Sequence, residues 1–297
     1  MSDHSLRGVI AAISTPIDDL GQPDMERLLG HARNLLDGGC DGINLLGTTG
    51  EATSFDVTQR KAVMNAVASS GLPLSRFMVG TGAASVSDAV LLTAEAGRLG
   101  FAGALLLPPF YYKPVSNEGI VRYIGAIAGA TAASNLPLYL YNFPALSGIA
   151  YTIELVDLLI ETFGRRIAGL KDSSGDLTYA RSIAALSPAL DVFPSNEGSL
   201  LEARTGAFAG CISATANLTA SDCATAFHEG DEAALRRAVA VRAIFDGLPL
   251  VPGIKHVLSI RMGDPAWREV VAPLSGLRAE EAATLETRLV TAMGVAA

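Results

Sequence analysis

Lysine is scarce in this chain, which has four among 297 residues: Lys61, Lys113, Lys171 and Lys255. Charged residues make up only 18% of the sequence, and the formal net charge is −8. An acidic chain without clustered Lys and Arg is a poor candidate for nucleic-acid binding, because phosphate contacts need such clusters. With hydrophobic residues at 49%, the chain is also too apolar for an intrinsically disordered protein.

Cysteine and histidine are too few and too scattered for the usual metal or disulfide patterns. The three cysteines are odd in number and far apart, which favours a reducing cytoplasm. No HExxH, Walker A, GxGxxG or GxSxG motif occurs, so we expect neither a metal nor an organic cofactor. No signal peptide and no apolar run of roughly 18 residues is evident, so we expect a cytoplasmic protein without a membrane partner.

Eight short apolar runs alternate with amphipathic stretches along most of the chain. Each run is apolar at consecutive positions, which is typical of a parallel strand covered on both faces. The runs lie at 8–15, 42–46, 77–81, 104–107, 137–142, 167–172, 190–195 and 210–213. Helical patterns lie between them. One covers 25–36 and ends at Gly38-Gly39, and others are capped by Ser85 or Ser87, Ser116, Thr152 and Asp176.

Eight strand-then-helix units in about 230 residues predict an α/β fold, a (β/α)8 TIM barrel. A doubly wound sheet is the competitor, but it usually has a glycine-rich turn after its first strand, where Thr15-Pro16 stands here. After residue 230 only helical patterns remain, at about 231–247, 254–262 and 279–293. We therefore predict a barrel with the active site over 1–230 and an all-helical C-terminal extension over 231–297.

Lys171 is the first candidate for catalysis, because it stands at the end of the sixth run, and strand ends face the active site of such a barrel. Burial there disfavours the charged ammonium, and the free amine attacks carbonyl groups. Lys61 and Lys255 lie in helical patterns, and Lys113 lies in a loop. The alternative is that Lys171 forms an ion pair with an acid such as Asp172.

Tyr141 and a pair of threonines stand at the ends of other predicted strands. The phenol of Tyr141 is a candidate acid–base group beside an imine, although core packing is the alternative. Thr48 and Thr49 lie in a glycine-flanked turn whose hydroxyls and N–H groups suit a carboxylate, with helix capping as the alternative. A lysine, a tyrosine and paired hydroxyls at one rim favour Schiff-base chemistry on a carbonyl substrate.

Five motifs occur in order along the chain: AISTP at 12–16, GTTGE at 47–51, FYY at 110–112, YNFP at 141–144 and GLKDSSGD at 169–176. On these motifs the sequence resembles the dihydrodipicolinate synthase / N-acetylneuraminate lyase family of pyruvate-dependent class I aldolases. The resemblance covers nearly the whole chain.

The resemblance implies a role for each residue of these motifs. Lys171 would form an imine with the keto carbon of pyruvate or another 2-oxo acid, and Tyr141 would shuttle protons. Thr48 would relay protons between Tyr141 and Tyr111 of a neighbouring subunit. The family expectation is a homotetramer, a dimer of dimers in which Tyr111 is shared across the dimer. The substrate would be bound by Thr48, Thr49, Ser173, Glu197, Ile212 and Ser213.

Two branches of the family differ at positions that contact the second half of the substrate. Synthases of the lysine pathway carry an arginine two residues after the proline of the Tyr-Asn-x-Pro motif, where this chain has Leu146. That arginine binds the second carboxylate of aspartate semialdehyde. The segment 145–148 is instead similar to the sialic acid lyase branch, which uses acidic residues after strand seven and a serine after strand eight. Glu197 and Ser213 match them, whereas Asn196 replaces an aspartate.

The sequence thus predicts a Schiff-base carbon–carbon lyase or aldolase acting on pyruvate and a 2-oxo acid. N-acetylneuraminate lyase, 2-keto-3-deoxygluconate aldolase and a hydroxy-oxoglutarate aldolase are the activities that the resemblance favours. Two alternatives stay open. One is dihydrodipicolinate (4-hydroxy-tetrahydrodipicolinate) synthase, which condenses pyruvate with aspartate semialdehyde. The other is a non-catalytic sensor of 2-oxo acids.

Overall fold

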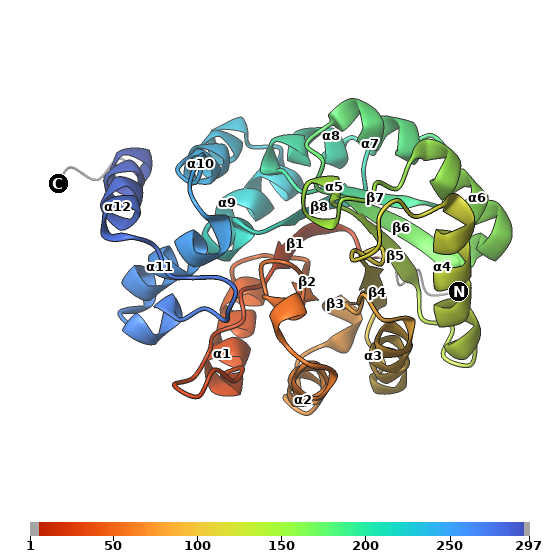
Figure 1. Ribbon diagram of the computed structural model, residues 1–297. Helices are drawn as coiled ribbons and strands as arrows, with labels where there is room; N and C mark the ends of the chain where they lie inside the picture. Colours follow the sequence, from red (N-terminus) through yellow and green to blue (C-terminus); the bar gives the residue numbers. More distant parts are fainter. Residues whose placement is uncertain (1–5, 294–297) are drawn as a thin grey trace.

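Eight parallel strands form the wall of a barrel (Figure 1). The structure, a computed structural model, describes residues 6–293; residues 1–5, where no signal peptide is expected, lie outside that range. The strands pair in the order β7-β6-β5-β4-β3-β2-β1-β8, and the N–H of Ala209 donates to the carbonyl of Val192 across the remaining side. Their bounds are β1 Gly8–Ala12, β2 Gly42–Leu45, β3 Phe77–Gly80, β4 Gly103–Leu106, β5 Leu138–Asn142, β6 Ile167–Asp172, β7 Asp191–Pro194 and β8 Gly210–Ser213. The predicted (β/α)8 barrel is confirmed.

Helices surround the strands, and side-chain caps decide where several of them begin. Each of Asp24, Ser85, Ser116, Thr152 and Asp176 accepts a hydrogen bond from a backbone N–H of the helix that follows it. Ser85, rather than Ser87, is therefore the cap of α3. The helices around the barrel are α1 Met25–Asp37, α2 Val57–Ala68, α3 Val86–Leu99, α4 Asn117–Ala130, α5 Pro144–Ser147, α6 Ile153–Phe163, α7 Leu177–Ala184, α8 Leu200–Arg204 and α9 Ala216–Glu229.

The C-terminal part is helical and lies to one side of the barrel (Figure 1). It contains α10 Glu232–Ala243, α11 Leu250–Met262 and α12 Ala279–Met293, and no strand follows β8 among the described residues. Helix α11 begins four residues before the predicted start, and α10 ends four residues before the predicted end. The boundary at residue 230 stays a prediction. These helices share an apolar cluster with Leu218 of α9: Val241, Ile244, Phe245, Ile254, Val257, Leu258, Trp267, Leu285 and Leu289.

Two further observations concern the helices and the cysteines of the described chain. Among the described residues, none of the helices has both the length and the apolar character needed to cross a membrane. The cysteines Cys40, Cys211 and Cys223 are all buried and free. The cytoplasmic location stays a prediction.

The alternation of side chains along each strand divides the core into two layers. On β5, Leu138 and Leu140 point outward and pack in the large cluster between barrel and helices. Tyr139 and Tyr141 belong to a smaller cluster inside the barrel, together with Phe193 of β7. The same alternation directs the side chain of Tyr141, the residue before the last one of β5, towards the barrel axis.

Tyr139 fills the interior below the strand ends, and two glycines on neighbouring strands make room for its ring. A Cβ at Gly103 would lie 2.6 Å from Tyr139 Cε2, and a Cβ at Gly169 would lie 2.6 Å from Tyr139 Cδ1. A Cβ at Gly169 would also lie 2.2 Å from the carbonyl oxygen of Asp191. All three contacts are shorter than atoms tolerate, so these two glycines are required by packing.

We predict that Gly169→Ala lowers the free energy of unfolding by about 1–3 kcal/mol, because the strand must move to accept the methyl group. Urea denaturation measures the change. Gly30→Ala is the control, since a Cβ at Gly30 in α1 meets nothing within 4 Å and should be neutral or stabilising. Equal stability of the Gly169→Ala variant and the native chain would contradict this account of the barrel interior.

Candidate active site

A cavity of about 510 Å³ opens at the carboxyl ends of the strands. Its lower wall is made of strand ends and the loops after them, and its upper wall includes residues 249–252 and Pro273-Leu274 of the helical extension. Six of the residues predicted to act on substrate line this cavity: Thr48, Thr49, Tyr141, Lys171, Ser173 and Ile212. The fold thus brings together residues that are far apart in the sequence, with 164 positions between Thr48 and Ile212.

Lys171 and Tyr141 are direct neighbours on adjacent parallel strands, since Tyr141 of β5 pairs with Lys171 of β6. The amine Nζ lies 4.3 Å from the centroid of the Tyr141 ring, and each residue is 3% exposed. The ion pair with Asp172 does not form. Asp172 points the other way and accepts hydrogen bonds from Asn142 Nδ2 at 2.8 Å and Ser174 Oγ at 2.8 Å. The amine is thus left facing the cavity.

The hydroxyl of Tyr141 lies 3.2 Å from Thr48 Oγ1 and shares a hydrogen bond with it. Simple core packing, with the hydroxyl bound to the backbone, is therefore not what the structure shows. The three side chains thus form a row in the order Lys171, Tyr141, Thr48. A proton near the amine of Lys171 can move through the hydroxyl groups of the other two.

The turn that carries Thr48 and Thr49 is bent by unusual backbone conformations. Leu46 has φ 53° and Glu51 has φ 55°, both left-handed and both rare for residues with a side chain. Such residues cost on the order of 1–3 kcal/mol each and tend to occur at functional sites. Neither threonine caps a helix, because the short 3-10 helix that follows has Glu51 at its N-cap position. Within residues 6–293 the N–H groups of Thr48 and Thr49 donate to no protein group, so they are available to a carboxylate.

Glu51 anchors this turn to the helical extension. Its carboxylate forms an ion pair with Lys255 of α11, both side chains are fully buried, and it also accepts from the N–H of Val271 at 2.7 Å. Lys255 Nζ donates in turn to the carbonyl of Glu269 at 2.7 Å. Burial lowers the pKa of Lys255, and the charge of Glu51 opposes that shift. The sequence reveals only that Lys255 lies on a helix, so this link was not predicted.

A second buried cation binds the carboxyl end of β3 beside the turn. Arg60 of α2 donates from Nη2 to the carbonyl of Gly80 at 2.8 Å and of Gly82 at 3.2 Å. Together with Thr48 and Tyr141 it lines a small cavity of about 20 Å³, which is enough for one water molecule. Burial lowers the pKa of Arg60 to about 10, which still leaves it charged at neutral pH.

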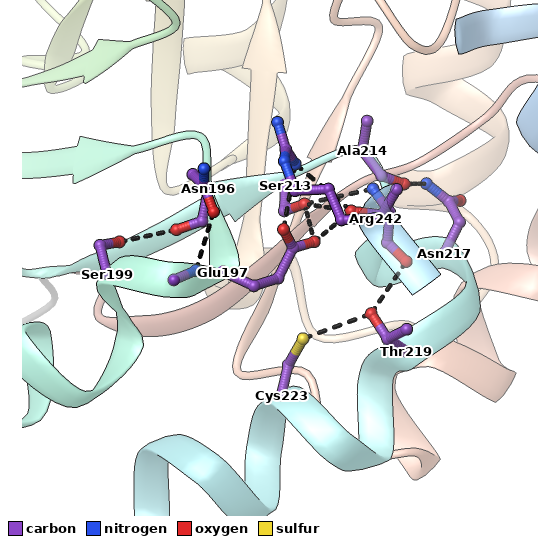
Figure 2. Close-up of polar contacts among 11 residues, drawn as sticks. Asn196, Glu197, Ser199, Ser213, Ala214, Asn217, Thr219, Cys223 and Arg242 are labelled. Carbon is purple, nitrogen blue, oxygen red and sulfur yellow. Dashed lines mark hydrogen bonds and ion pairs between the residues drawn. The ribbon is translucent and has the colours of Figure 1, made fainter. Parts of the chain in front are cut away.

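Three of the predicted site residues do not line the cavity. Tyr111 is 77% exposed on the loop between β4 and α4. Glu197 and Ser213 are both fully buried, and the hydroxyl of Ser213 donates to the carboxylate of Glu197 (Figure 2). Direct contact of Glu197 and Ser213 with substrate stays a prediction. Arg242 of α10, which sequence reasoning missed, does line the cavity.

The comparisons with known proteins agree with this architecture. The model of the Dihydrodipicolinate synthetase family matches residues 5–291. The chain belongs to this family. It is 34% identical over 287 residues to a DapA-like lyase of Chloroflexus aurantiacus, a match that covers 94% of each chain. The family resemblance drawn from the motifs is therefore confirmed.

Two solved structures are similar to this chain over nearly their whole length. Dihydrodipicolinate synthase from Agrobacterium tumefaciens has a TM-score of 0.89 at 28% identity, covering 96% of this chain and 98% of that one. The prophage protein YagE of E. coli K12, in complex with pyruvate, has a TM-score of 0.85 at 26% identity, covering 98% and 99%.

Within the described residues no cluster of His, Cys, Asp or Glu is suited to hold a metal ion.

We predict that Lys255→Met lowers the free energy of unfolding by about 3–5 kcal/mol, because it leaves the Glu51 carboxylate buried without its partner. Adding Glu51→Gln to Lys255→Met should recover much of that loss, since the unpaired charge disappears. Urea denaturation of the single and double variants measures the coupling. The control is Lys61→Met, whose amine lies 3.7 Å from Glu95 and whose side chain is 40% exposed, so that its loss should cost about 1 kcal/mol or less. Strictly additive losses in the double variant would show that the pair does not anchor the turn.

Proposed function

We propose that this protein is a Schiff-base lyase, a class I aldolase that interconverts a 4-hydroxy-2-oxo acid with pyruvate and an aldehyde. The observation that supports it is the amine of Lys171 against the ring of Tyr141, whose hydroxyl is bonded to Thr48, all on one cavity. The proposal needs neither a metal ion nor an organic cofactor.

The proposed reaction begins with the amine of Lys171 adding to the keto carbon of the substrate. Water leaves, and a C=N bond forms. The bond between the third and fourth carbons then breaks, its electron pair passes to the imine as an enamine, and the proton of the 4-hydroxyl leaves through Tyr141 and Thr48. The aldehyde departs, the enamine takes a proton at the third carbon, and water hydrolyses the imine to release pyruvate and the free amine.

The substrate carboxylate would lie against the turn at Thr48 and Thr49. Two hydroxyls and two unused N–H groups are there, and hydrogen bonds to an ionised carboxylate are stronger than neutral ones. This contact would set the keto carbon within reach of Lys171.

Leu146 bears on the alternative of dihydrodipicolinate synthesis. The residue lines the cavity and is 63% exposed, so no guanidinium is offered at this position to aspartate semialdehyde. A screen of pyruvate release from N-acetylneuraminate, 2-keto-3-deoxygluconate and 4-hydroxy-2-oxoglutarate, alongside condensation of pyruvate with aspartate semialdehyde, separates aldolase from synthase. Fast condensation with aspartate semialdehyde and no pyruvate release would favour the synthase.

We predict that borohydride reduction in the presence of pyruvate adds a reduced pyruvyl group to Lys171, as measured by peptide mass spectrometry. Lys171→Arg should abolish the adduct, because a guanidinium keeps the charge but forms no imine. Lys61→Arg is the matched control, because Lys61 lies on α2 with a side chain that is 40% exposed and does not line the cavity, and it should label like the native chain. An unlabelled Lys171 under saturating pyruvate would remove the basis of the proposal. If Lys171→Arg nevertheless responded fully to 2-oxo acids, the non-catalytic sensor would be favoured.

We further propose that a second copy of the chain brings Tyr111 to Thr48, within a homotetramer built as a dimer of dimers. Tyr111 and Tyr112 are each 77% exposed and lie edge to face at 5.3 Å. Two exposed aromatic rings on one loop are unusual unless a partner covers them.

We predict that Tyr111→Phe lowers kcat by on the order of 10²-fold, because the proton relay loses a hydroxyl, without changing the oligomeric state. Tyr112→Phe is the matched control and should keep kcat within a small factor. Steady-state kinetics and analytical ultracentrifugation provide the two measurements. A monomeric native chain with full activity would exclude a shared Tyr111.

A further inference from the structure

The cavity contains a cation that the proposed Schiff-base chemistry does not use. Among the described residues that line it, the charged side chains are Glu51, Lys171 and Arg242. Lys171 is the proposed nucleophile, and the carboxylate of Glu51 is buried against Lys255. Arg242 is therefore the charged group that remains for recognition of the substrate.

Arg242 is held in place by a carboxylate that lies behind it (Figure 2). Its Nη1 donates to Glu197 Oε2 at 3.0 Å and to Thr215 Oγ1 at 3.4 Å. The hydroxyls of Ser213 and Thr215 both donate to the other oxygen of Glu197. A fully buried carboxylate with three donors fixes the orientation of the guanidinium, because leaving any of these groups unpaired is costly.

The pair presents its positive end to the cavity. Glu197 is not exposed at all, whereas the side chain of Arg242 is 29% exposed. Among the described residues, the Nε and Nη2 groups of Arg242 donate to no protein group, so one side of its planar fork remains available. A guanidinium with two free N–H groups on one side matches the two oxygens of a carboxylate.

The surroundings of Arg242 favour an acid over a polyhydroxylated tail. The other residues that the helical extension contributes to the cavity are apolar: Pro249, Leu250, Val251, Pro252, Pro273 and Leu274. The hydroxyl-bearing lining residues come from the strand ends and the loops after them, at Thr48, Thr49, Thr53, Ser54, Tyr141, Ser173 and Ser195. A tail with several hydroxyl groups beside the extension would lose hydrogen bonds to water without replacing them, whereas a single carboxylate needs only Arg242.

We propose that Arg242 is a specificity-determining residue that binds a second carboxylate, so that the preferred substrates are 2-oxo diacids. Glu197 is a positioning residue that acts through Arg242 and does not touch the substrate. This inference rests on the proposed function, because it places the keto group at Lys171 and the second carboxylate at the far end of the molecule. Arg242 would thus provide the cation for the second carboxylate, which Leu146 cannot provide.

The test compares two 2-oxo acids of equal chain length, 2-oxoglutarate and 2-oxopentanoate, which differ by a carboxylate in place of a terminal methyl group. The readout is the concentration of each acid that gives half-maximal borohydride trapping on Lys171. The informative quantity is the half-maximal concentration of 2-oxopentanoate divided by that of 2-oxoglutarate, because general damage to the site affects both acids alike and leaves this ratio unchanged. For the native chain we expect 2-oxoglutarate to reach half-saturation at a concentration at least about tenfold lower than 2-oxopentanoate, because its second carboxylate would form charge-assisted hydrogen bonds.

Variants of Arg242 and Glu197 assign that ratio to the proposed contact. Arg242→Gln should bring the ratio close to one, Arg242→Lys should leave an intermediate value, and Glu197→Gln should lower the ratio although Glu197 never meets the substrate. Arg236→Gln is the matched control, because Arg236 lies on the same helix with a side chain that is 71% exposed. It should keep the native ratio.

The outcomes separate this inference from the proposed function. If no acid, pyruvate included, labels Lys171 in the native chain, the Schiff-base proposal fails. If labelling occurs but the native chain shows no preference for the diacid, or Arg242→Gln keeps the preference, then Arg242 is not the specificity determinant and only this inference fails. If Arg242→Gln does not fold, the inference is still rejected by a native chain that shows no preference for the diacid.

Discussion

The pairing of β5 with β6 is the constraint on which the site depends. Parallel strands in register place Tyr141 beside Lys171, and the alternation of side chains turns both towards the barrel axis. A shift of one residue in β6 would send Lys171 into the apolar layer beneath the helices, where Leu170 now lies. Gly169 protects this register, because the ring of Tyr139 occupies the space where a side chain would be.

The helical extension is part of the site as well as a cover for the barrel. Through Lys255 it pairs with Glu51 and steadies the strained turn of Thr48 and Thr49. Through Arg242 it provides a cation whose counter-charge, Glu197, comes from the barrel. Each contact joins a strand end to a helix more than forty residues further along the chain. The two regions are therefore coupled where the chemistry is proposed, and a change in the extension can alter the substrate preference.

Local sequence patterns predicted much of the fold because the information was local. The eight apolar runs and the caps at Ser116, Thr152 and Asp176 depend on residues within a few positions of one another. The five motifs, which occur in order along the chain and include Lys171, indicated the family. The same reasoning predicted that Glu197 and Ser213 contact substrate, which stays a prediction; the structure shows a hydrogen bond from Ser213 to Glu197, which the sequence did not predict. Arg242 was missed because an arginine in an amphipathic helix carries no local signal of the cavity that it faces.

The sequence by itself determined the strand and helix order, the family and the identity of the buried lysine at a strand end, since apolar periodicity and motif residues are written along the chain. Tertiary structure alone decided which charges meet. Glu51 with Lys255 and Glu197 with Arg242 are pairs set by burial and by the closure of the barrel, and the free energy of a buried charge depends on neighbours that are remote in sequence. For that reason the proposed contact of Arg242 with a second carboxylate follows from the folded molecule, whereas the contact of the first carboxylate with Thr48 and Thr49 is already suggested by the order of the residues.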